Sequence, residues 1–306
     1  MAKRYAAPME GLTTWLWRRV HAEIFGGADK YFTPFLSPND NCAFQKKELR
    51  EIDNTARLTV VPQILTARAE HLIWASRELA SRGFEEINLN AGCPSGTVTA
   101  KHKGAGLLCR IDELDALLDA VFTALPTMRI SVKTRVGYAS YEEWQALLAL
   151  YNRYPIHELI VHPRIRKDFY TGTARRSLYA WTKEHTDLPL VYNGDVTSPR
   201  DTAFAESLMA GRGLLRDPAL FRRASGGTPA SREELGAYVT ALAEGYEAEL
   251  GADAALHKMW ELWAYLIDAF RGGEPYLKAM RKCRTLSAYR GIAAAVLGEL
   301  PLAAEE

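Results

Sequence analysis

The chain has 306 residues, of which 48% are hydrophobic and 25% are charged. This composition is typical of a globular protein with a full core, and it excludes the disordered, collagen-like and disulfide-rich miniprotein classes. With 38 basic and 37 acidic residues the formal charge is +1. The chain therefore lacks the positive excess of a dedicated nucleic-acid scaffold, and any contact with a polyanion must use a local patch.

The four cysteines lie far apart and form no Cys-x-x-Cys pair. This spacing predicts neither a metal site nor a disulfide framework, and it is typical of the reducing cytoplasm, where we expect the protein to act. Pro8, Glu10 and Gly11 occupy the place of the apolar core that a signal peptide needs. No apolar run approaches the ~20 residues that cross a bilayer, so we expect no membrane association.

Short β-rich runs alternate with helical stretches as far as about residue 211. The runs that we expect to be strands are 5–9, 30–35, 58–64, 86–90, 129–133, 158–162, 188–193 and 207–210. Between them lie stretches such as 67–82 and 110–125, with apolar residues at the three- and four-residue spacing of a helix. Eight strand–helix units predict an α/β fold of the (β/α)8 TIM-barrel type, with a doubly wound sheet as the alternative.

The pattern changes after Phe221, where a Gly- and Ser-rich segment with a proline predicts a linker. Ser231 and Glu234 form a capping-box pattern that predicts the start of a helix, and 256–270 is another apolar helical stretch. We therefore expect a barrel domain over residues 1–224 and a small helical domain over 231–306.

The connection between the seventh and eighth strands is short. A parallel crossover generally needs a dozen or more residues, and 197–206 must supply all of this one. Either its helix is reduced to about two turns, or the eighth strand is partly missing and a phosphate site beside it is weakened.

Polar residues follow the apolar runs at the ends of several predicted strands. In a barrel the active site lies at the carboxyl ends of the strands. The residues at these ends include Pro8, Met9, Glu10, Gln63, Asn90, Cys93, Lys133, Arg135, His162, Arg164, Asn193, Asp195, Gly211 and Arg212.

Each of these residues also has an ordinary structural interpretation. Gln63 alone fits an exposed strand end, Lys133 and Arg135 fit solvated charges, His162 fits a hydrogen-bonded structural residue and Cys93 fits a small buried hydrophobe. The set favours an active site, because random surface polarity would not recur at one end of successive strands.

The residue types indicate separate chemical tasks. Gly211 and its neighbours allow a backbone to approach a phosphate, and Arg212 can add a bidentate contact. Lys133 can stabilise negative charge that develops on a cofactor ring, and Gln63 can pair with a flat heterocyclic edge. A phosphate, a flat ring and a cation together predict a flavin mononucleotide (FMN) site.

Cys93 lies in a Gly-Cys-Pro-Ser turn after a strand, so we expect its thiol to project into the barrel mouth. A thiol there could be a nucleophile or a proton donor. A cysteine–histidine hydrolase that pairs Cys93 with His162 remains open on spacing alone.

Seven motifs carry a resemblance to a known family. They are APMEG from Ala7, VPQ from Val61, NLNAGCPS from Asn88, VKTR from Val132, VHPR from Val161, NGDV from Asn193 and GRG from Gly211. In this order they resemble the tRNA-dihydrouridine synthase family over about residues 5–222. The cysteine motif followed by Lys103-Gly104-Ala105-Gly106 is the most specific part.

The resemblance implies a flavin enzyme that uses NADPH to reduce the C5–C6 double bond of selected uridines in tRNA. It implies that Cys93 is the catalytic proton donor to C5, and that Asn90 and Arg135 face the uracil. The positions that it matches to the flavin site are Pro8, Met9, Gln63, Lys133, His162, Asn193, Asp195, Gly211 and Arg212. One departure is Pro163, which stands where the family more often has glycine and removes a backbone donor.

A base stacked inside folded tRNA must be flipped out before a flavin can stack on it, which suits a deep barrel mouth. Local basic patches could hold the RNA by its phosphates. In the helical domain a basic stretch without any acid between Pro275 and Leu297 contains Lys278, Arg281, Lys282, Arg284 and Arg290. Lys101, with His102 and Lys103 after the cysteine turn, is a second predicted contact. Both patches also fit solvated surfaces.

Two alternatives remain beside this prediction. One is a flavin barrel that acts on a small molecule, and the other is a tRNA-binding relative that has lost its flavin, which the short crossover would favour. We expect a monomer with tRNA as its partner. The tRNA position would depend on how the helical domain orients the substrate.

Overall fold

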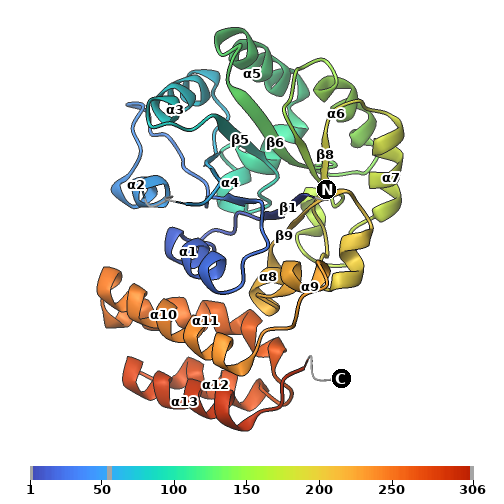
Figure 1. Ribbon diagram of the computed structural model, residues 1–306. Coiled ribbons are helices and arrows are strands. Elements are labelled where there is room, and N and C mark those ends of the chain that lie inside the picture. Colours follow the sequence, from blue (N-terminus) through green and yellow to red (C-terminus); the bar gives the residue numbers. More distant parts are fainter. Residues whose placement is uncertain (1–2, 54–56, 304–306) are drawn as a thin grey trace.

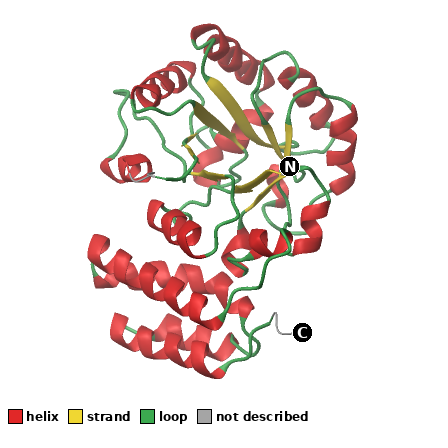
Figure 2. Ribbon diagram, in the orientation of Figure 1, coloured by secondary structure: helices red, strands yellow, loops and turns green. Residues whose placement is uncertain are grey.

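The computed structural model describes residues 3–53 and 57–303, in which parallel strands surround a central axis with helices outside them (Figures 1 and 2). The strands are β1 (Lys3–Ala6), β2 (Lys30–Phe32), β3 (Val60–Val61), β4 (Gln63–Ile64), β5 (Glu86–Ala91), β6 (Arg129–Arg135), β7 (Leu159–His162), β8 (Leu190–Tyr192) and β9 (Ser207–Ala210). Their order is β3-β2-β1-β9-β8-β7-β6-β5-β4, and every pairing is parallel. The predicted TIM barrel is confirmed.

Pro62 explains why one predicted strand is divided in two. β3 pairs with β2, whereas β4 pairs with β5, so the run 60–64 joins the two ends of the sheet. Proline has no N–H to donate, but the Pro62 carbonyl accepts from the amide of Asn88 at 2.9 Å. The sheet therefore curves round into a barrel, and the doubly wound alternative is wrong.

Helices cover the outside of the barrel (Figure 2). They are α1 (Trp15–Ile24), α2 (Lys46–Asp53), α3 (Ala69–Ser81), α5 (Ile111–Ala124), α6 (Glu143–Tyr151), α7 (Arg176–Glu184), α8 (Arg212–Arg216) and α9 (Leu220–Ala224). The short helices α4 (Gly96–Thr99), η1 (Gly104–Cys109) and η2 (Arg166–Asp168) belong to the segments that follow β5 and β7. Alternate side chains of the strands fill the barrel, among them Tyr5, Phe32, Ile160 and Met209. The interior is therefore a packed core rather than a pore.

An ion-pair network closes the amino-terminal end of the barrel. Lys30 Nζ donates to Glu86 at 2.7 Å and to Glu158 at 2.9 Å. The hydroxyl of Tyr5 donates to Glu158 at 2.6 Å, and Lys3 adds a bond at 3.0 Å. Because these buried carboxylates are paired, this end is occupied by protein and the open end is the carboxyl end.

The short crossover between β8 and β9 is a single 3-10 helix, η3 (Pro199–Ala203). β9 is nevertheless present and pairs along its length with β1, and Leu208 pairs with Tyr192 of β8. The side-chain amide of Asn193 also donates to the carbonyl of Met209 at 2.8 Å. The reduced helix is thus the correct alternative, and the strand beside the expected phosphate site is intact.

Four helices and a 3-10 turn form the C-terminal part: α10 (Arg232–Leu250), α11 (Ala252–Leu266), η4 (Ile267–Ala269), α12 (Glu274–Lys282) and α13 (Leu286–Glu299). The predicted capping box is confirmed, since the Ser231 hydroxyl accepts from the amide of Glu234 and the Glu234 carboxylate accepts from the amide of Ser231. No helix in residues 3–53 and 57–303 is long and apolar enough to cross a membrane.

The helical part packs directly on the barrel. α10 lies against α1, and α11 lies against α8 (Figure 1). Thr14 and Tyr246 share a hydrogen bond of 2.7 Å, and the indole of Trp15 donates to Glu249 at 3.0 Å. The boundary at 224/231 stays a prediction, because these contacts join the two parts closely.

Gly213 provides a test of how closely the crossover packs on α8. A Cβ at Gly213 would lie 2.0 Å from the carbonyl oxygen of Val196, so we expect Gly213→Ala to lower the free energy of unfolding by about 1–3 kcal/mol. Gly236 of α10 is the matched control, because a Cβ there meets nothing within 4 Å. Gly236→Ala should stabilise the helix by about 0.5–1 kcal/mol. Urea unfolding measures both, and equal effects of the two changes would contradict the packing argument.

Candidate active site

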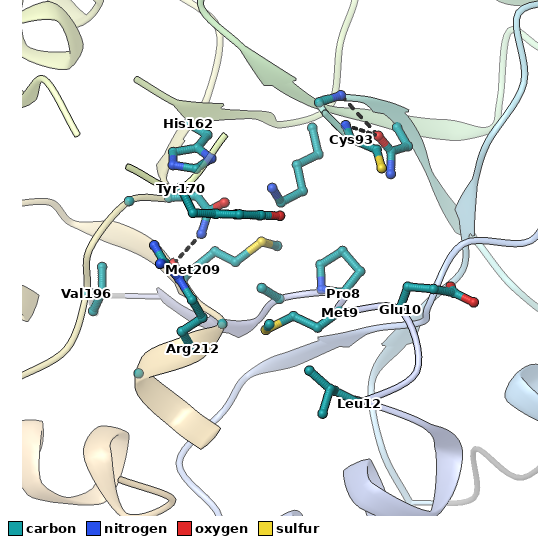
Figure 3. Close-up of a pocket in the computed structure, with 18 of the residues that line it drawn as sticks. Pro8, Met9, Glu10, Leu12, Cys93, His162, Tyr170, Val196, Met209 and Arg212 are labelled. Carbon is teal, nitrogen blue, oxygen red and sulfur yellow. Dashed lines mark hydrogen bonds between the residues drawn. The ribbon is translucent and has the colours of Figure 1, made fainter. Parts of the chain in front are cut away.

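A cavity of about 330 Å³ opens at the carboxyl ends of the strands (Figure 3). Its lining contains Cys93, Asn90, Arg135 and every residue that the resemblance matches to a flavin site, namely Pro8, Met9, Gln63, Lys133, His162, Asn193, Asp195, Gly211 and Arg212. The structure thus brings together residues from β1 to α8. Lys101, Lys278, Arg281 and Lys282 do not line the cavity.

A chain of side-chain amides shapes the turn that carries the cysteine. Gln63 donates to Asn88 at 2.7 Å, and Asn90 donates to the Gln63 oxygen at 2.8 Å. The oxygen of Asn90 accepts from the amides of Gly92 and Cys93 at 3.0 and 2.9 Å. Asn90 therefore holds the cysteine turn, in addition to its expected place beside the substrate.

The Cys93 thiol is half-buried, and its pKa is raised by that burial although Lys133 and Arg135 oppose the shift. At neutral pH the sulfur therefore holds its proton, which suits a proton donor better than a thiolate nucleophile. Cys93 and His162 lie on opposite sides of the cavity in Figure 3, and no hydrogen bond between them occurs among the described residues. This arrangement gives no support to a cysteine–histidine hydrolase.

Lys133 projects into the cavity from β6. Burial lowers the pKa of its amine from 10.5 to about 7, and the neighbouring Arg135 adds to the shift. A buried amine without a counter-charge loses its proton readily, whereas an anion or an acceptor-rich ring edge would favour the ammonium form. The site is therefore poised for a ligand of that kind.

His162 is neutral in this environment. Burial lowers the pKa of its ring well below 6.5, and the cations Arg135, Lys133, Arg164 and Arg212 add to the effect. Nη1 of Arg164 lies 3.0 Å from Nε2 of His162. A guanidinium can only donate, so Nε2 accepts and the proton of the neutral ring is on Nδ1.

Asp195 orients two arginines at one end of the cavity. Its carboxylate accepts from Arg164 at 2.7 Å, from the amide of Ala174 at 2.8 Å and from Arg212 at 3.2 Å. Burial alone would raise the pKa of Asp195, but the Arg164 hydrogen bond and the other contacts hold it below its usual range. The Asp195 carboxylate is thus occupied by these contacts, and it holds the guanidinium of Arg212 at the cavity.

Glycine is required where the backbone passes close to these groups. A Cβ at Gly194 would lie 2.8 Å from the side chain of Ala174, and one at Gly211 would lie 3.0 Å from the sulfur of Met9. Gly211 precedes α8, whose first amides have no partner within the helix. Together with Arg212 they can donate to a phosphate.

Arg135 is almost fully buried, with 1% of its surface exposed. Nε donates to the carbonyl of Gly92 at 3.0 Å, Nη1 to Ile165 at 2.8 Å and Nη2 to Phe169 at 2.6 Å. It thereby ties the cysteine turn to the loop after β7. Its expected contact with uracil stays a prediction, while its observed contacts position both loops.

Two tyrosines at the mouth were missed by the sequence reasoning. Tyr170 lines the cavity from the loop after β7, and its ring carries the guanidinium groups of Arg135 and Arg212 at 5.3 and 4.9 Å. Tyr265 lines it from α11. Tyr170 comes eight residues after His162, on the loop that follows a predicted strand, so the sequence could have indicated a place near the barrel mouth. Nothing in the local sequence places Tyr265 there.

The predicted basic contacts lie outside the cavity. Lys278, Arg281 and Lys282 are exposed on α12, and none of them forms an ion pair within the described part of the chain. Arg290 differs, since it pairs with Glu247 at 2.7 Å. Lys101 is exposed just after α4.

The comparisons with known proteins agree with this geometry. A sequence profile described as Dihydrouridine synthase (Dus) matches residues 5–290. A "Probable tRNA-dihydrouridine synthase" of Staphylococcus aureus (strain COL) is 30% identical over 232 residues, which cover 71% of this chain and 70% of the relative. A "Probable tRNA-dihydrouridine synthase 2" of Bacillus subtilis (strain 168) is 30% identical over 237 residues, with the same coverage.

Among solved structures, a variant of NCR from Zymomonas mobilis aligns with a TM-score of 0.50 at 14% identity, covering 77% of this chain and 90% of that one. This likeness concerns the fold alone. The profile match spans most of the chain, and the relatives are 30% identical to it over about 70% of both lengths. The chain therefore belongs to the dihydrouridine synthase family.

Proposed function

We propose that this protein reduces the C5–C6 double bond of uridines in tRNA to dihydrouridine, with bound FMN, NADPH as electron donor and Cys93 as proton donor. The observation that carries the proposal is one cavity that combines the Cys93 thiol, the half-buried Lys133 amine and an arginine-rich end. Family membership and the names of the relatives support the tRNA substrate.

The residues of the cavity fit FMN. Lys133 suits the acceptor-rich edge of the flavin ring, and so does the second N–H of the Gln63 amide, whose first N–H binds Asn88. Pro8 and Met9 line the same cavity. His162 and Asn193 continue toward Arg212 and the Gly211 turn, which suit the phosphate. Within residues 3–53 and 57–303, Asp195 pairs with Arg164 and Arg212, whereas Lys133 and Arg135 form no ion pair. An anionic ligand would therefore relieve the repulsion among these cations.

The reduction adds one hydride and one proton to the uracil ring. Bound FMN, once reduced by NADPH, would supply the hydride that C6 receives. Cys93 then gives its proton to C5, and the sulfur regains a proton from solvent, so the net addition is two hydrogen atoms. Lys133 would hold the ring edge of the cofactor as an ammonium and stabilise negative charge there. Asn90 keeps the cysteine turn in place through its bonds to the amides of Gly92 and Cys93.

The activity is tested by incubating the protein with FMN, NADPH and tRNA that lacks dihydrouridine, and by digesting the RNA for mass spectrometry. We expect uridines heavier by two hydrogens, and Cys93→Ala should slow their formation about 10²–10⁴-fold while flavin binding persists. Cys109→Ala is the matched control, because Cys109 is exposed outside the cavity. Full activity of Cys93→Ala would remove the thiol from the mechanism.

Lys133 makes flavin binding depend on pH. Because the ligand favours the ammonium, binding takes up a proton above pH 7, and the affinity for FMN should fall as the pH rises from about 7 to 9. Lys133→Met should bind more weakly, with no such slope. Riboflavin, which has no phosphate to titrate, should show the same difference. Equal pH profiles for both proteins would contradict this role.

The lowered pKa of Lys133 also makes the free energy of unfolding of the flavin-free protein depend on pH. Between about pH 7 and the ordinary lysine pKa of 10.5, the unfolded lysine binds a proton that the folded one does not. The free energy of unfolding should therefore rise with pH over that range in the wild type and lose this component in Lys133→Met.

The exposed cations of α12 should contact tRNA phosphates. The triple change Lys278→Gln, Arg281→Gln and Lys282→Gln should weaken tRNA binding and reduce the slope of log K against log salt by up to about 2 to 3, with flavin content unchanged. Arg290→Gln is the control, because Arg290 already pairs with Glu247. Unchanged affinity and slope in the triple variant would make α12 an ordinary solvated face. If the wild type showed no preference for tRNA over another polyanion, a small-molecule substrate would be favoured.

A further inference from the structure

Two neighbouring aromatic side chains are exposed on the loop after β7. Phe169 is 42% exposed and Tyr170 is 54% exposed, and Leu250 at the end of α10 is the one other large apolar residue of this kind within residues 3–53 and 57–303. Tyr170 lines the cavity, whereas Phe169 lies just outside it. The loop thus places an exposed aromatic ring, which has no part in the cavity lining, beside the cavity mouth.

The backbone holds Phe169 in a costly conformation. Its φ is 48° and its ψ is −103°, in a region that bulky residues rarely adopt. The amide of Phe169 donates to the carbonyl of Arg166 at 3.1 Å, and its carbonyl accepts from buried Arg135 at 2.6 Å. These two bonds hold the backbone of Phe169 in place, and its ring points to solvent.

One cation lies against this ring, and two more belong to the same loop. The guanidinium of Arg166 lies 4.8 Å from the centre of the Phe169 ring, and it also reaches Thr99 of α4 at 3.4 Å. Lys167 and Arg175 are exposed, and neither has an ion pair within the described ranges. The guanidinium of Arg175 lies 3.4 Å from the centre of the Tyr141 ring, and that contact leaves its charge without a counter-ion.

Asp168, the acid between these residues, forms no ion pair with the three cations in the described part of the chain. The carboxylate of Asp168 accepts from the hydroxyl of Tyr141 and from the amide of Ile165. An aromatic ring among unpaired cations is the chemistry that binds unstacked nucleotides, because bases stack on the ring and phosphates meet the charges.

We propose that Phe169 stacks on the base next to the target uridine and replaces the stacking that this base loses when the uridine enters the cavity. Lys167 and Arg175 then contact the flanking phosphates. The inference rests on the proposed function, since it needs an RNA substrate whose target base leaves the stack. Arg135 joins the parts, because the same guanidinium holds the cysteine turn and the Phe169 carbonyl.

The test compares Phe169→Ala, Phe169→Leu and Phe169→Trp for dihydrouridine formation in unmodified tRNA. We expect kcat/KM to fall on the order of 10- to 100-fold for alanine, in keeping with the measured effect of removing one base–aromatic stack. Leucine should be equally impaired, and tryptophan should restore the rate. Leu250→Ala is the matched control for an exposed apolar side chain away from the cavity, and it should leave the rate unchanged.

A second readout reports the stack itself. With 2-aminopurine beside the uridine that the wild type modifies, binding to the wild type or to Phe169→Trp should leave the fluorescence quenched. Binding to Phe169→Ala should raise it. Flavin content, thermal unfolding and NADPH oxidation with a small artificial acceptor should be the same in all variants, which separates loss of the stack from loss of the flavin site or of the fold.

Wild-type kcat/KM for Phe169→Ala, or a leucine variant as active as the tryptophan variant, would overturn the inference and leave the proposed function standing. A change of oligomeric state in Phe169→Ala, measured by light scattering, would overturn it in favour of self-association. Absence of dihydrouridine with the wild type would overturn the proposed function, and this inference with it.

Discussion

One buried guanidinium joins the loops that form the upper part of the cavity. The guanidinium of Arg135 donates one hydrogen bond to each of three carbonyls, those of Gly92, Ile165 and Phe169. A buried charge is tolerated only when it is hydrogen-bonded, and these carbonyls would lose their partner without it. The position of the Cys93 thiol and that of the aromatic loop therefore depend on the same side chain.

Burial and the charge of Arg135 together shift the pKa values of its neighbours. Burial is the larger cause that lowers the pKa of Lys133 and of His162, and the charge of Arg135 is the second. For the Cys93 thiol, burial raises the pKa although the same charge opposes it. Asp195 restrains Arg164 and Arg212 at the other end. The result is a cavity with a proton to give and with cations that an anionic, acceptor-rich ligand would stabilise.

The strands and their polar ends could be predicted because hydrophobic runs and turn residues are local signals. The roles of Asn90 and Asp195 could not, since their oxygens bind the protein's own amides and arginines. Tyr265 reaches the mouth only through the packing of α11 on the barrel, and Pro62 divides a strand that the pattern shows as continuous. Contacts between distant segments decide each of these cases.

The most direct test of the account is the visible absorption spectrum of the purified protein, with extraction of its chromophore and addition of FMN to whatever remains free. We expect equimolar FMN and a spectrum altered from that of free flavin, because Lys133 and Arg212 face one cavity. A colourless protein that binds no FMN when it is supplied would contradict the reductase assignment and would leave an RNA-binding member of the family.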